Sequence, residues 1–349
     1  MSLQNFGWSH FFLQQLSLED LEAFVPARVI AMHRSGLILN DGNAELRVAL
    51  GSRWFQGDSE ERPTVGDWLL VDGARAKAVR LLDRKSLFKR RAAGLKVEIQ
   101  LIAANIDTLF VVTSCNEEFN ESRLERYFTL ATDSAVEPVV VLTKSDMCNH
   151  CEGFVDRVRA VSRSVVVEVV NALDAATLEG VRAWCERGQT IALVGSSGVG
   201  KSTLVNTLAG REVQTTHGIR EDDAHGRHTT THRSLHLLDE GGLLLDVPGL
   251  RELGIADTGD SLADVFDDVE ALTTRCRFTD CGHRSEPGCA VREAIESGRL
   301  DERRLRNYEK LLREEARNTA TLSEQRHERR RFAKRVRQVV KEKERFRPT

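Results

Sequence analysis

Short apolar runs separated by turn-forming residues dominate the first part of the chain. Five such runs, PARVIAMHR, GLILN, AELRVAL, DWLLVDG and AKAVRLL, lie within residues 26–90, and Asn40-Asp41-Gly42 and Asp72-Gly73 are turn signals. This pattern predicts five closely spaced β-strands and therefore a small barrel. The five-stranded barrel that binds oligonucleotides (the OB type) is one candidate. A packing module without a ligand of its own is the alternative.

From about residue 104 the pattern changes to continuous apolar runs that alternate with helical stretches. Such runs are typical of parallel strands covered on both faces, which predicts an α/β domain. The expected strands are Thr108–Thr113, Pro138–Leu142, Val165–Val169, Thr190–Val194 and Gly242–Leu245, and the expected helices are Glu121–Thr132, Leu178–Glu186 and Ser202–Ala209. After about residue 258 the strand pattern stops, and a Cys/His cluster precedes a long charged helical segment.

Composition narrows the class of protein. The chain has 349 residues, 41% of them apolar, which favours two or three packed domains. No run approaches the roughly 20 apolar residues of a membrane-spanning helix. The first residues lack the features of a secretion signal, and seven unevenly spaced cysteines disfavour a disulfide framework. We therefore expect a cytoplasmic protein that does not bind membranes.

The segment IALVGSSGVGKSTLV carries a phosphate-binding loop between a buried strand and a helix. Backbone N–H groups and the helix N-terminus create a positive field there, and the lysine adds a full charge near the β and γ phosphates. The candidate nucleotide contacts are Gly195, Ser196, Ser197, Gly198, Val199, Gly200, Lys201, Ser202 and Thr203. Ser202 is also a candidate Mg²⁺ ligand. The site predicts a nucleoside triphosphate.

Two further motifs belong to the same chemistry. In LLLDVPGL, Asp246 ends an apolar strand, where it can orient Mg²⁺, and Gly249 can offer its N–H to the γ-phosphate. In VVVLTKSDM, Thr143, Lys144, Ser145 and Asp146 follow a buried strand and resemble the guanine-specificity element [N/T]KxD of GTPases. A carboxylate there can accept both guanine edge hydrogens, so we expect GTP rather than ATP. The segment Val170-Asn171-Ala172 is a weaker candidate for the backbone clamp on the base.

The order of these motifs is unusual, because the base element precedes the phosphate loop, and this order indicates a circular permutation. A barrel, a permuted GTPase domain and a Cys/His tail resemble the bacterial small-subunit-dependent GTPase family called RsgA or YjeQ. The resemblance rests on IAANIDTLFVV, GSSGVGKSTLVN, GRHTTTHR, DVPG and the cysteine cluster. We expect an N-terminal extension (1–25), an OB-like β-barrel (26–100), a circularly permuted GTPase domain (101–257), and a zinc-binding α-helical module with a basic helical tail (258–349).

The polar segment THGIREDDAHGRHTTTHRSLH predicts a switch that the γ-phosphate and Mg²⁺ order. Thr230 is the preferred Mg²⁺-ligating threonine, with Thr229 as its competitor. Leu250 occupies the position where many GTPases have a water-orienting Gln, which predicts slow unaided hydrolysis. The family resemblance implies that His228 positions or activates the water as the catalytic residue. A plain solvent-exposed loop histidine is the alternative.

The cluster Cys276, Cys281, His283 and Cys289 supplies a Cys₃His set within a short segment, which suits one structural Zn²⁺ per chain. Cys148-Asn149-His150-Cys151 also has metal-like spacing, but it lacks a second pair nearby, so free thiols are expected there. Residues 324–349 hold eleven Lys and Arg against four Glu, in a chain whose net charge is −3. This basic helical tail makes RNA phosphates plausible ligands.

Together these features predict a GTPase that hydrolyses GTP to GDP and phosphate, with Mg²⁺ bound alongside the nucleotide. The resemblance implies that a monomer binds the small (30S) ribosomal subunit and its 16S rRNA late in maturation, with ribosome stimulation of hydrolysis. A static RNA-binding protein with little nucleotide turnover is the alternative. An ATP-dependent small-molecule kinase is disfavoured by Thr143–Asp146.

Overall fold

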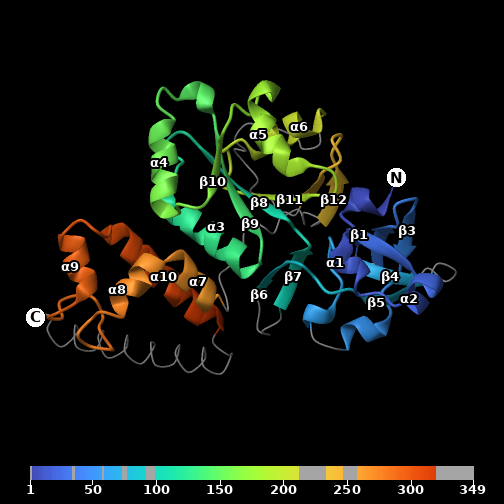
Figure 1. The fold of residues 1–349 in the computed structure, drawn as a ribbon, viewed down its shortest axis with the longest axis horizontal. Coiled ribbons are helices and arrows are strands. Elements are labelled where there is room, and N and C mark those ends of the chain that lie inside the picture. Colours follow the sequence, from blue (N-terminus) through green and yellow to red (C-terminus); the bar gives the residue numbers. More distant parts are fainter. Residues whose placement is uncertain are drawn as a thin grey trace, which may run out of the picture.

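One long β-sheet forms the frame of the molecule. The computed structural model describes residues 2–33, 36–56, 59–72, 77–91, 99–211, 233–246 and 258–319. Within these residues the strand order is β10-β9-β8-β11-β13-β12-β1-β2-β3, with β4 and β5 branching from β1. Figure 1 shows the parallel part of this sheet in the middle, the N-terminal strands at the right and helices α7–α10 at the left.

The five predicted strands of the α/β part are confirmed. They are β8 (Thr108–Ser114), β9 (Glu137–Thr143), β10 (Val166–Val169), β11 (Thr190–Val194) and β13 (Leu243–Asp246), and all their pairings with one another are parallel. All seven residues of β8 are buried, because helices cover both faces of the sheet. This burial explains why the strands are continuous apolar runs rather than alternating ones.

Two of the predicted helices are confirmed, as α3 (Glu121–Asp133) and α6 (Lys201–Ala209). The single helix predicted for 178–186 is wrong: the segment holds a 3₁₀ turn (Ala175–Leu178), the short helix α5 (Glu179–Arg182) and a second 3₁₀ turn (Ala183–Cys185). At its start the side chain of Asp174 accepts the N–H of Ala176 and Thr177 Oγ1 donates to the Asp174 carbonyl oxygen. Asp174 is thus the N-cap of the first 3₁₀ turn.

Sequence analysis did not predict helix α4 (Glu152–Val161). Its signal is the apolar set Phe154, Val155, Val158 and Val161 at helical spacing. Helices α3 and α4 cover one face of the parallel sheet, where Leu124, Phe128 and Val158 belong to the main core. The other face is covered by α5 and α6 through Val181, Leu204 and Leu208.

Of the predicted polar switch segment (216–236), only residues 233–236 lie within the described residues, and they form a strand. Strand β12 (Arg233–Leu237) occupies residues that the prediction assigned to the switch, and its alternating Ser234-Leu235-His236-Leu237 pattern is the signal. β12 pairs antiparallel with β13 and also with β1 through Ala31 and Met32. The sheet of the α/β part therefore continues into the N-terminal strands.

The N-terminal strands form an antiparallel unit with its own core. The strands are β1 (Val25–His33), β2 (Gly36–Asn40), β3 (Glu45–Val48), β4 (Trp68–Asp72) and β5 (Lys77–Leu81). Their order is β3-β2-β1-β4-β5, and apolar residues such as Val29, Leu39 and Leu69 fill the unit. Pairing of β3 with β5, which would close a barrel, is absent from the described strands, so the closed barrel stays a prediction. A hairpin of β6 (Leu87–Arg91) and β7 (Ile99–Ala104) follows.

The N-terminal extension packs onto this unit. It consists of a 3₁₀ turn (Leu3–Phe6) and the helices α1 (His10–Leu13) and α2 (Leu18–Ala23). The fully buried Arg28 donates to the carbonyl oxygens of Phe6 (2.5 Å), Gly66 (3.1 Å) and Asn105 (2.8 Å). Burial lowers the pKa of this guanidinium to about 10. Arg28 thereby joins the extension, the β1–β5 unit and the start of the α/β part.

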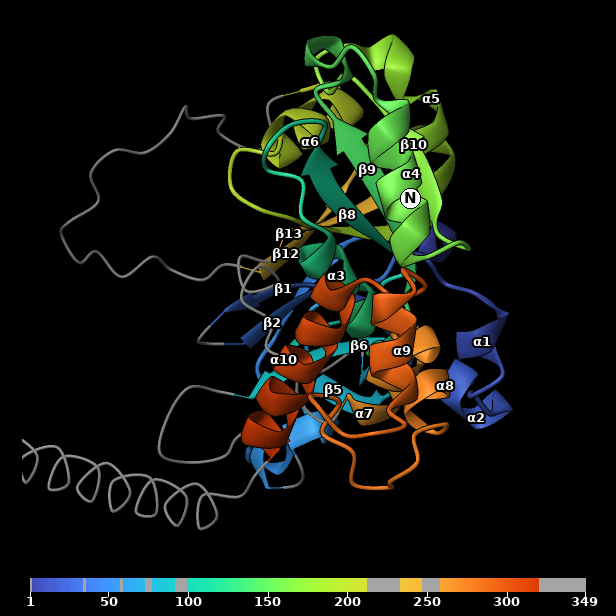
Figure 2. The same ribbon diagram turned by 90° about the vertical axis from the view of Figure 1, so that its left-hand side faces the viewer.

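Four helices follow the sheet: α7 (Gly259–Val265), α8 (Asp267–Thr273), α9 (Ala290–Glu296) and α10 (Glu302–Thr319). Helices α7 and α10 pack against α3, and α8 packs against α7 and α9; Figure 2 shows these helices below the parallel sheet. Phe266 and Tyr308 join the main core there, with ring centroids 5.3 Å apart. This confirms an α-helical C-terminal part within the described residues. None of the described helices has the length and apolarity to span a membrane.

Candidate nucleotide-binding site and metal centre

The predicted nucleotide motifs meet at one edge of the sheet. β9, β8, β11 and β13 are consecutive parallel neighbours, so their carboxyl ends lie at the same edge. Thr143 ends β9, Val194 ends β11 just before the phosphate loop, and Asp246 ends β13. This is the usual location of ligands in open α/β sheets.

The phosphate loop has the backbone that its glycines allow. Gly195 and Gly200 have φ of +144° and +95°, a region that residues with a Cβ rarely adopt. Gly200 is the N-cap of α6, which starts at Lys201. The loop therefore leads directly into a helix N-terminus, whose free N–H groups favour an anion.

Lys201 lies along the inside of this loop. The residue is 6% exposed, and its Nζ donates to the carbonyl oxygens of Gly195 (2.9 Å) and Ser196. Ser202, in the first turn of α6, is half-buried, whereas Ser197 and Gly198 at the tip of the loop are exposed. The ammonium group is thus placed at the loop that would surround the phosphates.

A second cationic side chain, which sequence analysis did not predict, contacts the phosphate loop. Arg123, in the first turn of α3, donates to Ser196 Oγ, and a longer bond of 3.4 Å reaches the Glu118 carbonyl oxygen. No local sequence motif predicts this contact, because Arg123 and Ser196 are far apart in sequence. The two meet because β8, which precedes α3, pairs with β11.

The base element is also connected to the phosphate loop. Thr143 is fully buried, and its Oγ1 donates to the carbonyl oxygen of Val199 (2.5 Å), with the Thr113 carbonyl oxygen at 3.2 Å. Asn usually occupies this position, and here the threonine hydroxyl makes the contact with the phosphate loop. Lys144 has φ of +58°, and Asp146 follows in an exposed 3₁₀ turn. The carboxylate is therefore free to face a base.

The candidate backbone clamp lies next to this turn. The N–H of Ser145 donates to the Val170 carbonyl oxygen (3.3 Å), and Thr207 Oγ1 donates to the Ala172 carbonyl oxygen (2.7 Å). These bonds place residues 170–172 between the base element and α6. His228, Thr229, Thr230, Gly249 and Leu250 lie outside the described residues.

The predicted zinc ligands converge. The sulfur atoms of Cys276, Cys281 and Cys289 and a ring nitrogen of His283 all lie within 4.8 Å of one another. His283 Nδ1 is 3.6 Å from both Cys276 Sγ and Cys289 Sγ. Three soft sulfurs and one imidazole nitrogen suit tetrahedral Zn²⁺, and no position is left for a substrate water. The cluster is therefore compatible with a structural zinc.

Glu286 organises the loop that carries these ligands. Its carboxylate accepts the backbone N–H groups of Gly282 (3.0 Å), Arg284 (2.8 Å) and Ser285 (3.0 Å). These backbone hydrogen bonds lower the pKa of Glu286 to about 2. The negative charge is thus present at neutral pH, where it fixes the loop around His283.

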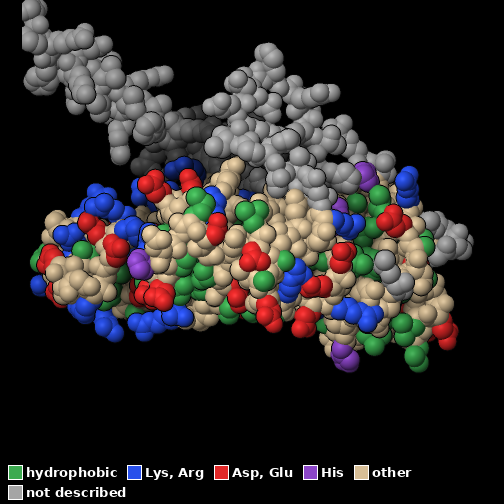
Figure 3. All heavy atoms as spheres, turned by 90° about the horizontal axis from the view of Figure 1, so that it is seen from above, with side chains coloured by type: hydrophobic (Ala, Val, Ile, Leu, Met, Phe, Trp, Pro, Cys, Tyr) green, Lys and Arg blue, Asp and Glu red, His purple; other side chains and the backbone are tan. Residues whose placement is uncertain are grey.

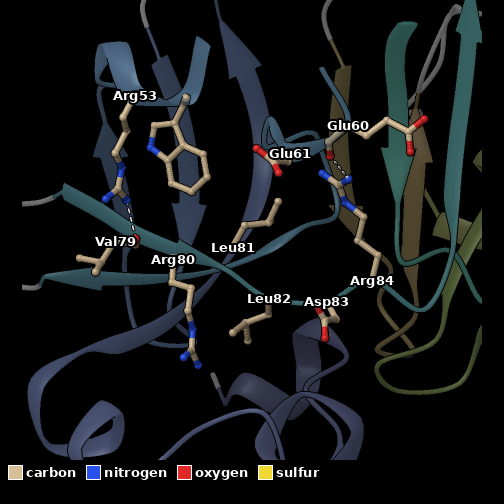
Figure 4. A pocket seen from close by; sticks show the side chains of 10 residues that line it. Arg53, Glu60, Glu61, Val79, Arg80, Leu81, Leu82, Asp83 and Arg84 are labelled. Carbon is tan, nitrogen blue, oxygen red and sulfur yellow. Dashed lines mark hydrogen bonds between the residues drawn. The ribbon is translucent and has the colours of Figure 1, made fainter. Parts of the chain in front are cut away.

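A pocket of about 540 Å³ lies in the N-terminal unit, and Figure 4 shows Arg53, Arg80 and Arg84 among its lining side chains. Arg84 forms a paired contact with the buried carboxylate of Asp67, with both oxygens at 2.8 Å. Both acidic and basic side chains line the pocket, and none of its lining residues belongs to the nucleotide motifs. We therefore assign no nucleotide to it.

Comparisons of the sequence with known proteins agree with this geometry. The family model described as RsgA GTPase matches residues 81–256. A model described as ABC transporter matches residues 178–344, which include the phosphate loop common to both kinds of nucleotide-binding protein. The chain is 51% identical over 343 residues to small ribosomal subunit biogenesis GTPase RsgA 2 of Vibrio parahaemolyticus, covering 98% of this chain and 93% of the relative. The RsgA of Mesorhizobium japonicum is 43% identical, over 92% of each chain.

Solved structures share the fold. The crystal structure of YjeQ from Thermotoga maritima has a TM-score of 0.60 at 24% identity, covering 83% of this chain and 99% of that one. YloQ, described as a circularly permuted GTPase, has a TM-score of 0.56 at 20% identity, covering 83% and 94%. The fold, the permuted motif order and the whole-chain identity lead to one conclusion: the chain belongs to the RsgA family of circularly permuted GTPases, and it is a GTP hydrolase.

Proposed function

We propose that this protein is a cytoplasmic, monomeric GTPase that binds the small ribosomal subunit and assists its late maturation, with hydrolysis stimulated by the subunit. The convergence of Thr143–Asp146, the phosphate loop and Asp246 at one sheet edge carries the proposal. The partner follows from the relatives, which are named small ribosomal subunit biogenesis GTPases.

Each part of the site has a role in this reaction. The Asp146 carboxylate accepts hydrogen bonds from the N–H groups at the edge of guanine. Residues 195–203, which include Lys201, surround the phosphates. Ser202, Asp246 and Thr230 would hold Mg²⁺, which neutralises phosphate charge when it is bound. By the family resemblance, His228 positions the attacking water, since Leu250 has no group that could do so. Thr229 remains the alternative magnesium ligand.

An exposed basic surface supports the binding of 16S rRNA. Figure 3 shows many Lys and Arg side chains at the end of the molecule formed by α7–α10. In the loop that carries the Cys₃His cluster, the guanidinium of Arg277 lies 5.5 Å from the ring centre of Phe278, which is 42% exposed. Exposed aromatic and arginine side chains can stack on unpaired bases. A bound zinc would hold this loop in shape, and the basic residues of 324–349 add positive charge.

Single-turnover GTP hydrolysis with and without purified small subunits tests the proposal, with ATP as the comparison nucleotide. We expect slow GTP hydrolysis alone, strong stimulation by subunits and no comparable use of ATP. Lys201→Ala should abolish both rates with the fold intact. His228→Ala should lose only the stimulation, at unchanged GTP affinity and subunit binding.

Three results would contradict parts of this scheme. Unchanged hydrolysis in Lys201→Ala would refute the phosphate-loop assignment. Full stimulation of His228→Ala would remove that residue from catalysis. Subunit binding without any stimulated hydrolysis would favour the static RNA-binding alternative.

A further inference from the structure

Three cysteine sulfurs converge behind the base element. The Sγ atoms of Cys115, Cys148 and Cys151 lie within 4.8 Å of one another. Cys115 directly follows β8, and its N–H donates to the Thr143 carbonyl oxygen (3.0 Å). Cys148 and Cys151 follow the turn that contains Asp146. Sequence analysis expected free thiols here, because the third sulfur comes from a distant part of the chain.

The three cysteines lie at the edge of the main hydrophobic core, which includes Cys115. Cys115 is 4% exposed, whereas Cys148 and Cys151 are half-buried at the ends of a turn, so the cluster has an apolar side and a side that solvent reaches. The Cys151 thiol donates to the Ser145 carbonyl oxygen (3.8 Å), a weak bond that the thiolate of a metal site would give up. A disulfide would use two of these sulfurs, whereas a thiolate metal site uses all three.

The donor set defines the chemical class of the ion. Three sulfur ligands without a carboxylate select a thiophilic cation such as Zn²⁺ over Mg²⁺ or Ca²⁺. Among the described residues, no fourth protein ligand joins the three cysteine sulfurs. The nearby His150 is exposed and is not part of the cluster. The fourth position of a tetrahedral ion would therefore hold water.

We propose that Cys115, Cys148 and Cys151 form a second metal site, distinct from the Cys₃His cluster, which binds Zn²⁺ as three thiolates and releases the thiol protons to solvent. The ion would join the end of β8 to the segment that follows Asp146. It would therefore restrain the turn that presents the carboxylate to guanine. The GTPase assignment does not depend on this site.

Metal counting tests the proposal on the full chain, reduced and freed of metal and then titrated with Zn²⁺ alone under native mass spectrometry. Because two clusters are present, we expect two ions per wild-type chain. Cys148→Ser should bind one, and Cys281→Ser, which damages the other cluster, should also bind one. Cys185→Ala is the matched control: it removes a buried thiol of the same α/β part outside both clusters and should still bind two. A single ion in wild type together with none in Cys281→Ser would overturn the proposal.

Alkylation gives a second measurement that needs no variant. Iodoacetamide should label Cys148 and Cys151 in the metal-free native protein, and Zn²⁺ should protect both. Equal labelling with and without Zn²⁺ would contradict the site. Loss of labelling that a thiol reductant restores in the absence of metal would show a disulfide instead, and would also overturn the proposal.

Discussion

At the scale of single residues, Thr143 connects two functions of the site. Its hydroxyl lies in the base element but donates to the phosphate loop at Val199. The bond is fully buried, so the carbonyl oxygen has no water to replace a lost donor. The loop conformation and the base element are therefore held together before any nucleotide binds.

We predict that Thr143→Val loosens the phosphate loop. Valine preserves the shape but leaves the Val199 carbonyl oxygen without this donor, which costs about 1–3 kcal/mol. Urea denaturation should show that loss, and a titration should show weaker GTP binding. Thr129→Val is the control, since its hydroxyl donates within α3 to the Glu125 carbonyl oxygen. If both variants bind GTP like wild type, Thr143 has only a structural role.

At the scale of elements, α3 connects the nucleotide site to the C-terminal helices. Its first turn carries Arg123, which contacts Ser196 of the phosphate loop. Two residues later Glu125 is fully buried, and its carboxylate accepts from Arg303 (3.0 Å), Arg304 (3.1 Å) and Asn307 (2.5 Å) on α10. The N-terminal part of α3 therefore contacts both the phosphate loop and α10.

Removing this buried carboxylate should separate α10 from α3. Burial opposes the charge on Arg304, but Asp268 and Glu125 outweigh it and raise the pKa of the guanidinium. Glu125→Ala leaves two arginines with one acceptor fewer, and we predict a stability loss of about 3–5 kcal/mol by urea denaturation. Glu314→Ala removes the partly exposed ion pair with Arg126 and should cost at most about 1 kcal/mol. Equal losses in the two variants would contradict the importance of burial.

At the scale of the whole molecule, the described parts of the chain are joined by direct contacts rather than forming independent domains. β12 pairs with β1, Arg28 joins three parts, and α3 holds the C-terminal helices. The division at residues 25, 100 and 257 stays a prediction about sequence segments. The Cys₃His loop projects from the helical end, between α8 and α9.

Loss of zinc should therefore destabilise the loop and its neighbouring helices before other parts of the molecule. We predict that Cys281→Ser loses the ion at the Cys₃His cluster, because it replaces a thiolate of a closed four-ligand site with a hydroxyl, which is a poor zinc ligand. Amide hydrogen exchange should rise in α8, α9 and the loop between them, while GTP affinity stays at the wild-type value. Unchanged exchange in this region would show that packing on α3, rather than metal, holds the loop.

The sequence by itself determined the parts whose chemistry is local. The phosphate loop, Thr143–Asp146 and the Cys₃His cluster are short motifs, so their residues meet whatever the rest of the chain does. The parallel strands were equally predictable, since burial on both faces demands continuous apolar runs. The division of the segment 178–186 into short turns was not predicted from its sequence.

Only the tertiary structure decided which distant groups meet. Arg123 reaches Ser196 because β8 pairs with β11, and Cys115 joins Cys148 and Cys151 because β8 pairs with β9. Glutamate usually occupies solvent-exposed positions of helices. Glu125 is buried because α10 covers it. The physical reason is the same in each case: hydrophobic periodicity reports which face of an element is buried, but not which polar partner lies across the interface.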